Sequence, residues 1–384
     1  MKEILVFTDY YLPGYKGGGP IITLSNMVSK ISSFRFKILT RDHDLNSSPY
    51  LNVKRREWTP VGNAIVYYMS KEEISFKSLN TIINSIKFDL YYLNSFFSVY
   101  YTLFPLILRK LKKLPSKPVI LAPRGEFFTG ALGLKKYRKK IYLILFKILK
   151  LHKEIIWQAS NDVEKAAIQA LFTKKAQIIV APILISLNIN DKKKIPKINK
   201  EPGQLNIIFL SRISRIKNLD YALNLLISLK GSIRFEIYGP IEDKVYWKEC
   251  SQIIKTLPNN ITVIYKGLFR KSESINIFQN NHVFLFPTKG ENFGHVIFES
   301  LAEGCPVIIS DQTPWKNLHE LKVGWDIPIS NHEKFIAILY KLIKMNNMDY
   351  VELSKNATKY VENLVKDQTR VKKNIELFQL ALSL

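Results

Sequence analysis

Short hydrophobic runs alternate with amphipathic stretches along most of this chain. The runs are rich in β-branched and aromatic residues, which favours strands. Strands are expected at Ile4–Thr8, Phe36–Thr40, Ile65–Tyr68, Leu90–Leu93, Val119–Ala122, Ile155–Gln158, Ile178–Val180, Ile207–Ser211, Phe235–Tyr238, Thr262–Tyr265, Val283–Pro287 and Val307–Ile309. The helical spacing of apolar residues predicts helices at Pro20–Ile31, Lys77–Ser85, Ser98–Lys112, Lys135–Lys153, Val163–Ala170, Leu219–Leu229, Lys244–Leu257, Ser272–Asn280 and His295–Gly304. A helical tail with a break near Asn346 is expected from about Asn331.

This alternation of strands and helices is typical of a parallel sheet with helices on both faces. It is interrupted by a polar segment, Asn188–Gln204, which has the composition of an interdomain linker. We therefore expect an α/β fold with two Rossmann-like, doubly wound domains, at residues 1–190 and 191–345. Terminal helices at 346–384 can pack back on the first domain. Two such domains normally bind a ligand in a cleft at the carboxyl ends of their strands.

Charge is distributed unevenly between the two halves of the chain. The 384 residues carry a formal net charge of +25. Residues 1–200 hold 34 Lys+Arg and 13 Asp+Glu (+21), whereas residues 201–384 hold 23 and 19 (+4). The densest basic run, Lys135–Lys140, opens the expected helix with a broad apolar face, which suits an anionic membrane surface. A core helix with a solvated lysine edge is the plainer alternative, and nucleic-acid binding is a third.

Several classes of protein are disfavoured by what the sequence lacks. The two cysteines, Cys250 and Cys305, exclude a disulfide framework and a cysteine-rich zinc site. The six histidines are scattered and no Asp-x-Asp occurs, so we expect neither a metal site nor a resident cofactor. No apolar stretch suits a signal peptide or a membrane span. We expect a cytoplasmic protein that is peripheral on the inner face of the cell membrane.

Three loops carry candidate chemistry. The glycines Gly17–Gly19 precede Pro20 after the first strand, and a glycine-rich loop that leads into a helix is a ready anion site. Arg212 and Lys217 follow the strand at Ile207–Ser211, where two cations could neutralise a diphosphate and stabilise a departing phosphate. Taken alone, the glycine loop is equally consistent with an ordinary tight turn, and the Arg212–Lys217 segment is more consistent with a solvated basic loop.

The third segment, Phe286–Ile308, carries the most specific signal of the three. It places Glu291 before a helix that begins near Gly294, and Glu299 lies within the first turns of that helix. The helix N-terminus offers amides and a positive dipole end to a phosphate. Glu291 can accept hydrogen bonds from a polyol, and Glu299 can accept both ribose hydroxyls.

The pair Arg212-x4-Lys217, together with Glu291-x7-Glu299 and Phe293-Gly294, resembles the retaining glycosyltransferase family 4 of the GT-B fold, as found in bacterial surface-polysaccharide synthesis. The Gly17–Gly19 loop and Ala122–Gly125 match its N-domain loops more loosely. The resemblance covers nearly the whole chain, and it implies that the domain at 1–190 binds the acceptor and the domain at 191–345 binds the nucleotide sugar. It implies a transfer with retention and without metal, from a nucleotide-diphosphate sugar, UDP- or GDP-linked, to a saccharide or lipid-linked acceptor. Lipopolysaccharide, O-antigen or capsule biosynthesis is the context that it suggests.

The resemblance also implies roles for individual residues. Arg212, Lys217 and Glu291 would be catalytic, with the two cations on the diphosphate and Glu291 on the donor sugar. The remaining donor contacts would come from Gly18, Gly19, Asn292, Phe293, Gly294, His295, Val296 and Glu299, the last on the ribose. Arg124 and Glu126 are candidate substrate-binding residues, near the position where many members have a histidine. The alternatives are a GT-B-like sugar epimerase or phosphorylase, and a non-catalytic polyanion-binding protein.

Overall fold

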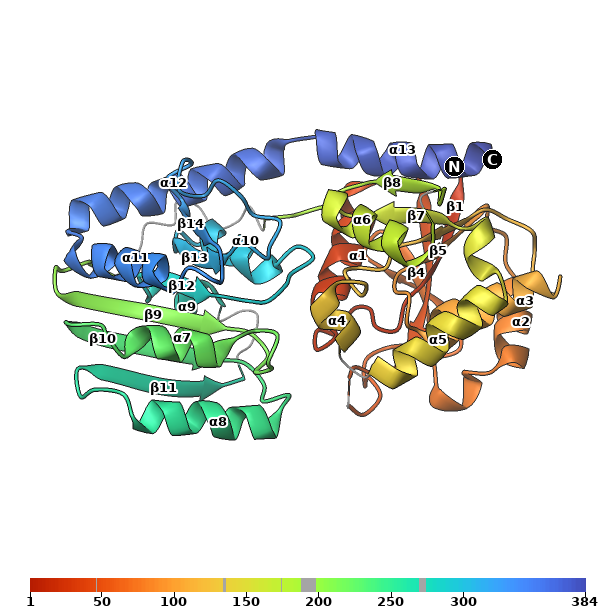
Figure 1. Cartoon of the computed structure of the whole chain (residues 1–384). Coiled ribbons are helices and arrows are strands. Elements are labelled where there is room, and N and C mark those ends of the chain that lie inside the picture. The colour runs from red at the N-terminus through yellow and green to blue at the C-terminus, as the bar shows by residue number, and fades with distance from the viewer. Residues whose placement is uncertain (46, 134–135, 174, 188–197, 269–273) are drawn as a thin grey trace. The chain divides into compact units, whose positions relative to one another are not determined.

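The computed structural model of the chain describes residues 1–384 except 46, 134–135, 174, 188–197 and 269–273 (Figure 1). The chain divides into two compact units. Unit 1 comprises Met1–Ser186 and Gln368–Leu384, and unit 2 comprises Leu187–Asp367. The expected domain boundary at 190 and 191, and most of the expected linker, lie outside the described residues.

Unit 1 is built on an eight-stranded sheet with the order β3-β4-β2-β1-β5-β6-β7-β8. Its strands are β1 (Glu3–Phe7), β2 (Arg35–Arg41), β3 (Trp58–Val61), β4 (Ala64–Met69), β5 (Leu90–Leu93), β6 (Val119–Leu121), β7 (Ile156–Ala159) and β8 (Ile178–Val180). Its helices are α1 (Gly19–Lys30), α2 (Phe76–Asn84), α3 (Phe104–Lys110), α4 (Thr129–Gly133), α5 (Lys136–Ile148), α6 (Asp162–Leu171) and α13 (Thr369–Ser383). Short helical turns lie at η1 (Lys71–Glu73), η2 (Val99–Leu103, a π-helix) and η3 (Leu151–Glu154). All neighbouring strands are parallel except β3 and β4.

Both faces of this sheet are covered, because successive residues of a strand point to opposite sides. In β1, Ile4 and Val6 join the cluster that contains α1 and α13, whereas Leu5 and Phe7 join the cluster that contains α2, α3 and α5. These β1 residues are fully buried. The burial on two faces explains why the strands read as continuous hydrophobic runs in the sequence.

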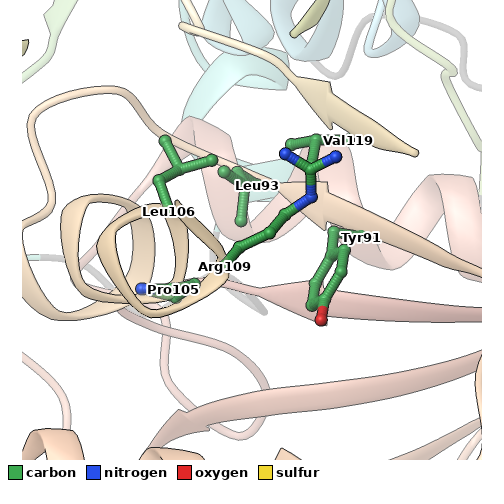
Figure 2. Close-up of a pocket in the computed structure, with 6 residues that line it drawn as sticks. All are labelled: Tyr91, Leu93, Pro105, Leu106, Arg109 and Val119. Carbon is green, nitrogen blue, oxygen red and sulfur yellow. The ribbon is translucent and has the colours of Figure 1, made fainter. Parts of the chain in front are cut away.

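Figure 2 shows how closely α3 packs on the sheet. Arg109 extends from the helix beside Val119, and its Nε donates to the Lys117 carbonyl at 3.2 Å. Tyr91, Leu93, Pro105 and Leu106 complete the contact, and the six side chains leave no space for a water molecule between them. We therefore assign this contact to the core and not to a ligand site.

Unit 2 has a six-stranded, entirely parallel sheet with the order β11-β10-β9-β12-β13-β14. Its strands are β9 (Gln204–Leu210), β10 (Ser232–Tyr238), β11 (Ile261–Gly267), β12 (Val283–Phe286), β13 (Val307–Ser310) and β14 (Gly324–Ile327). Its helices are α7 (Leu219–Leu226), α8 (Lys244–Lys255), α9 (Ser274–Gln279), α10 (His295–Ala302), α11 (His332–Lys344) and α12 (Asn347–Lys366). This is the Rossmann strand order, in which the order reverses between β9 and β12.

The structure differs from the sequence-based expectation in several elements. The strands β3 and β14 and the helix α4 were not expected, and the expected helix start at Ser272 lies outside the described residues. The basic helix α5 ends at Ile148 instead of Lys153, because Lys150 adopts a left-handed backbone (φ 51°) before η3. The segment expected at 346–384 is divided between the units. In unit 2, Ser354 of α12 donates to the Gly304 carbonyl at 2.6 Å after α10, and only α13 belongs to unit 1.

Candidate functional site

The candidate site of unit 2 lies where the strand order reverses. The loop after β9 and the loop after β12 are joined there by hydrogen bonds. The Lys289 amide donates to the Ile216 carbonyl at 2.8 Å, and Asn218 Nδ2 donates to the Pro287 carbonyl at 2.9 Å. The Glu291 amide donates to the Gln312 carbonyl at 3.0 Å, which adds the loop after β13. Carboxyl ends of strands at such a reversal are the usual ligand site of this topology.

These loops bring Lys217 and Glu291 together. Lys217 Nζ forms an ion pair with Glu291 Oε1, although 74 positions separate the two residues. The ammonium also lies 5.5 Å from the centre of the Phe286 ring. Their side chains are 13% and 15% exposed, so the pair is largely shielded yet open to solvent on one side. A cation and a carboxylate held in this way can bind a phosphate and a hydroxylated ring, respectively.

The helix α10 begins beside this pair. Gly294 is its N-cap, with φ 79°, and no side chain caps the helix. A Cβ at Gly294 would lie 2.8 Å from Ile297 Cδ1, so both the backbone angle and the packing favour glycine. The first turn of α10 contains no acidic residue, although the Glu291 side chain lies close to the N-cap. The arrangement is that of an anion site at a helix N-terminus.

The other expected residues of α10 have different surroundings. The Phe293 side chain is buried against Trp315, whose Nε1 donates to the Phe293 carbonyl at 2.5 Å. Phe293 can therefore contribute to a ligand site only through its backbone. Asn292, His295, Val296 and Glu299 are all partly exposed.

The structure does not bring Arg212 to the Lys217–Glu291 pair. Arg212 Nη1 instead pairs with Glu242 at 2.8 Å, and both side chains are about half exposed. Arg215, on the same loop, pairs with Glu249 at 2.6 Å and lies over the Tyr246 ring, which ties the loop to α8. An exposed pair of this kind contributes little energy, so Arg212 can change partner at low cost.

In unit 1, Gly18 and Gly19 lie at the N-terminus of α1 as expected. Gly18 is the N-cap, with φ 69°, and a Cβ there would meet no atom within 4 Å. The loop before it is held by Asp44, whose Oδ2 accepts from the Tyr15 and Lys16 amides at 2.7 and 2.8 Å. Asp44 was not singled out from the sequence, because only the folded chain brings it to this loop.

Arg124 is fixed at the carboxyl end of the unit 1 sheet. It has a left-handed backbone (φ 57°). Its Nε donates to Asn94 Oδ1 at 2.8 Å and its Nη2 donates to Tyr92 Oη at 2.5 Å. Tyr92 Oη in turn donates to Gln158 Oε1 at 2.5 Å. The side chain is partly exposed, which leaves a ligand contact available to it.

Glu126 has the surroundings of a structural residue. Its carboxylate accepts from Ser95 Oγ at 2.8 Å, the Phe96 amide at 2.5 Å and the Phe97 amide at 3.1 Å. Burial raises the pKa of this carboxyl above its usual range, although these hydrogen bonds act in the opposite direction. The carboxylate anchors the loop after β5, and the substrate contact expected for Glu126 stays a prediction.

Two further kinds of feature are missing from the described part of the chain. There, no group of three or more His, Cys, Asp or Glu residues is arranged to hold a metal ion. None of the described helices combines the length and the apolar character needed to cross a membrane.

The chain is similar to known proteins in sequence and in fold. Residues 190–362 match the family model described as "Glycosyl transferases group 1". An uncharacterized 41.2 kDa protein from the cps region of Klebsiella pneumoniae is 29% identical over 230 residues, which is 59% of this chain and 61% of that protein. The alpha-monoglucosyldiacylglycerol synthase of Streptococcus pneumoniae is 26% identical over 168 residues, 43% of this chain and 37% of the synthase. The matched regions thus span less than two thirds of either relative.

Solved structures resemble the whole chain in fold. Anabaena HepE in complex with UDP-glucose is 14% identical over all of both chains, with a TM-score of 0.69. WaaG, a glycosyltransferase of lipopolysaccharide biosynthesis, is 13% identical over 97% of this chain and 98% of its own, with a TM-score of 0.63. The chain therefore has the GT-B fold of glycosyltransferases, and its second unit matches the group 1 glycosyltransferases over residues 190–362.

Proposed function

We propose that this chain is a glycosyltransferase that moves a sugar from a nucleotide-diphosphate sugar to a saccharide or lipid-linked acceptor, with retention at the anomeric carbon. The observation that carries the proposal is the Lys217–Glu291 pair beside the N-terminus of α10. It lies at the strand-order reversal of the unit that matches the group 1 family. The Lys217 ammonium and the helix N-terminus complement a phosphate in charge, and the Glu291 carboxylate can accept hydrogen bonds from sugar hydroxyls.

In this proposal the donor occupies the site of unit 2. Lys217 and Arg212 bind the diphosphate, and the backbone amides at 292–296 complete its anion site. Glu291 accepts hydrogen bonds from the donor sugar, and Glu299 accepts the ribose hydroxyls. Gly18 and Gly19 offer a further uncapped helix N-terminus to an anionic group.

Glu291 neutralises Lys217 in their ion pair. A bound diphosphate competes for the ammonium and leaves the carboxylate to the sugar hydroxyls. As the anomeric bond breaks, negative charge grows on the departing diphosphate, and Lys217 stabilises it. The diphosphate can itself accept the proton of the acceptor hydroxyl, so we propose a reaction without a protein base, a metal or a resident cofactor.

The relatives suggest the biological setting. One is encoded in a Klebsiella cps region, and another is named as a glucosyl-diacylglycerol synthase. A UDP-glucose complex exists for a protein of the same fold. We propose surface-polysaccharide or glycolipid synthesis, with a UDP-linked donor as the first to test.

We also propose that unit 1 works on an anionic membrane, through α5. The buried face of this helix carries Tyr142 and Phe146. A second apolar stripe remains exposed, with Tyr137 84%, Ile141 67% and Ile148 70% accessible, and with Ile144 and Leu145 between them. Residues at this spacing share one face of a helix.

The charges around this stripe suit an anionic lipid surface. Exposed cations flank it at Lys136, Arg138, Lys140, Lys147, Lys150 and Lys153. An amphipathic helix with apolar and basic residues arranged in this way lies in the interface of an anionic bilayer. Such binding would place the protein on the inner face of the cell membrane.

The transferase proposal is tested with a panel of UDP-, GDP- and ADP-sugars. Nucleoside diphosphate release is measured with and without alkyl pyranoside acceptors, and proton NMR of the product gives the anomeric configuration. We expect one nucleotide to be used selectively, with retention. A protein that releases no nucleoside diphosphate from any donor contradicts the proposal, and inversion contradicts the proposed stereochemistry.

A further inference from the structure

A series of hydrogen-bonded polar side chains runs through unit 1 from Arg124 to α13. At the carboxyl edge of the sheet, Arg124 Nη2 donates to Tyr92 Oη at 2.5 Å. Tyr92 Oη donates to Gln158 Oε1 at 2.5 Å, and Gln158 Nε2 donates to Asn374 Oδ1 at 3.2 Å. Tyr92 lies on β5, Gln158 on β7 and Asn374 on α13. These three residues, which we call the polar network, connect elements that are far apart in the sequence.

Each hydrogen bond of the polar network has a fixed direction. A guanidinium can only donate, so the Tyr92 hydroxyl accepts from Arg124 and its own proton points to Gln158. Gln158 Nε2 also donates to the Ala181 carbonyl at 3.1 Å, which keeps the amide oxygen toward Tyr92. Burial raises the pKa of the Tyr92 phenol, although Arg124 acts in the opposite direction, so the hydroxyl stays protonated. Each bond therefore depends on the orientation of the next side chain.

The far end of the polar network lies near both segments that connect unit 1 to the rest of the chain. Asn374 Nδ2 donates to the Pro182 carbonyl at 2.8 Å, close to the point where the chain leaves unit 1 after Ser186. Asn374 itself lies in α13, the helix with which the chain returns to unit 1. Hydrogen bonds thus connect Arg124 to both of these segments.

The polar network is buried in the hydrophobic layer between the sheet and α13. Tyr92, Gln158 and Asn374 are 0%, 1% and 2% exposed. Every side-chain nitrogen and oxygen of the network is paired, as burial of polar atoms requires. Apolar side chains of the same shape would fill this layer at similar or lower cost. Packing alone therefore does not account for three polar residues here.

The polar network acts on the Arg124 side chain, whereas other residues hold the Arg124 backbone. The Gly125 amide donates to the buried Glu164 carboxylate at 2.5 Å, which fixes the left-handed turn at Arg124. The guanidinium is held by two neutral acceptors, Asn94 Oδ1 at 2.8 Å and Tyr92 Oη at 2.5 Å. Its charge and its remaining N–H groups are left for a substrate, on the side where Arg124 is partly exposed.

We propose that Tyr92, Gln158 and Asn374 are positioning residues that orient Arg124 for substrate binding, so that α13 contributes to the reaction through Arg124. The proposal rests on the proposed transferase function and on the substrate contact expected for Arg124. A free arginine side chain samples many rotamers, and fixing one of them costs entropy when the substrate binds. Directed bonds from a buried network meet this cost during folding, so the side chain is ready before the substrate arrives.

The test breaks the polar network at each of its members with Tyr92→Phe, Gln158→Met and Asn374→Leu. The matched control is Tyr91→Phe, a neighbouring buried tyrosine whose hydroxyl donates to a carbonyl on the other face of the sheet at 3.0 Å. Each variant is made in wild type and in Arg124→Met, which removes the guanidinium. We measure the Tm, and kcat and KM by nucleoside diphosphate release from the nucleotide sugar that wild type uses fastest.

We expect each of the three network variants to lower kcat/KM about tenfold in wild type, as loss of a good hydrogen bond does. In Arg124→Met they change it less than twofold, because residues that act through Arg124 have nothing left to position. Tyr91→Phe lowers the Tm about as much as Tyr92→Phe but changes kcat/KM less than twofold in either background. Equal losses of kcat/KM in both backgrounds, or an Arg124→Met protein as active as wild type, overturn the proposal.

A wild type that releases no nucleoside diphosphate refutes the transferase function, and the orientation of Arg124 is then measured without activity. In NMR spectra of protein labelled with ¹⁵N-arginine, the Nε–H signal that disappears in Arg124→Met belongs to Arg124. We expect Tyr92→Phe and Asn374→Leu to shift or broaden this signal, and Tyr91→Phe to leave it unchanged. An Arg124 signal that is the same in all of these proteins contradicts the positioning role.

Discussion

Removal of the Lys217 charge tests the donor site most informatively. Lys217→Met keeps the length of the side chain but leaves Glu291 without its ion-pair partner. The carboxylate is 15% exposed, so it cannot recover full hydration. Glu291→Gln, made alone, leaves the ammonium unpaired in the same way. The double variant removes both charges and leaves neither residue ionised.

The partial exposure of the ion pair sets the size of the expected effects on stability. Breaking a fully buried pair costs about 3–5 kcal/mol, and partial exposure reduces this to about 1–3 kcal/mol for each single variant. For a unit of this size the Tm falls by about 2–4 °C per kcal/mol. The double variant returns most of that stability. Catalysis behaves differently, because loss of one charge-stabilising contact raises the barrier by about 2.7–4 kcal/mol, about a hundredfold or more in rate.

The assay combines thermal unfolding with nucleoside diphosphate release. The matched control is Lys289→Met, which removes an exposed lysine from the neighbouring loop without touching the pair. We expect the double variant to regain stability but not turnover, and the control to match wild type in both. Single variants with wild-type stability and turnover would refute both the pair and its role. A double variant that regains turnover would refute the catalytic role alone.

Ile141→Ser and Ile148→Ser each weaken binding to phosphatidylglycerol-containing vesicles at least about tenfold at moderate salt, because each removes a membrane-inserted side chain. Val163→Ser, at a similarly exposed position on α6, is the control and has no effect. Equal losses in all three variants contradict the proposal that the exposed stripe of α5 binds the membrane. Burial lowers the pKa of His282 to about 4, so the unfolded chain binds this proton between about pH 6.5 and 4 while the folded chain does not. As the pH is lowered from about 6.5 to 4, the wild-type protein therefore loses about 3 kcal/mol of stability, which is seen as a fall in Tm. In His282→Gln the Tm falls less over the same pH range. A dependence of Tm on pH that is the same in both proteins contradicts this role of His282. Glu126→Gln lowers the free energy of unfolding by about 1–3 kcal/mol, while the KM for the acceptor stays the same. A raised KM with an unchanged Tm would instead show that Glu126 contacts the substrate, as expected from the sequence.

Most of the fold could be predicted because burial on both faces leaves a plain signal. Strands such as β1 and β9 are nearly continuous hydrophobic runs, and the helices between them keep the helical spacing. The edge strand β3 was missed because its four residues, Trp58–Val61, include a proline and are not buried. The end of α5 was missed because Lys150 adopts a left-handed backbone, for which a lysine gives no sequence signal.

The candidate site was predictable only in part. Residues that follow strands and precede helices could be recognised locally, as Lys217 and Glu291 were. Their pairing depends on two loops whose contact is set by the sheet order. The partners of Glu126 are amides of another loop, so its structural role left no mark in its own sequence neighbourhood.

The most direct test of the central claim, that unit 2 binds a nucleotide-diphosphate donor, is calorimetric titration of wild type and Glu299→Ala with UDP, GDP and ADP. The account predicts that wild type binds one of the three selectively. It also predicts that Glu299→Ala weakens this binding about tenfold or more, because a carboxylate bond to the ribose is lost. Wild type that binds none of the three, or a Glu299→Ala protein that binds as well as wild type, contradicts the placement of the donor at the N-terminal end of α10.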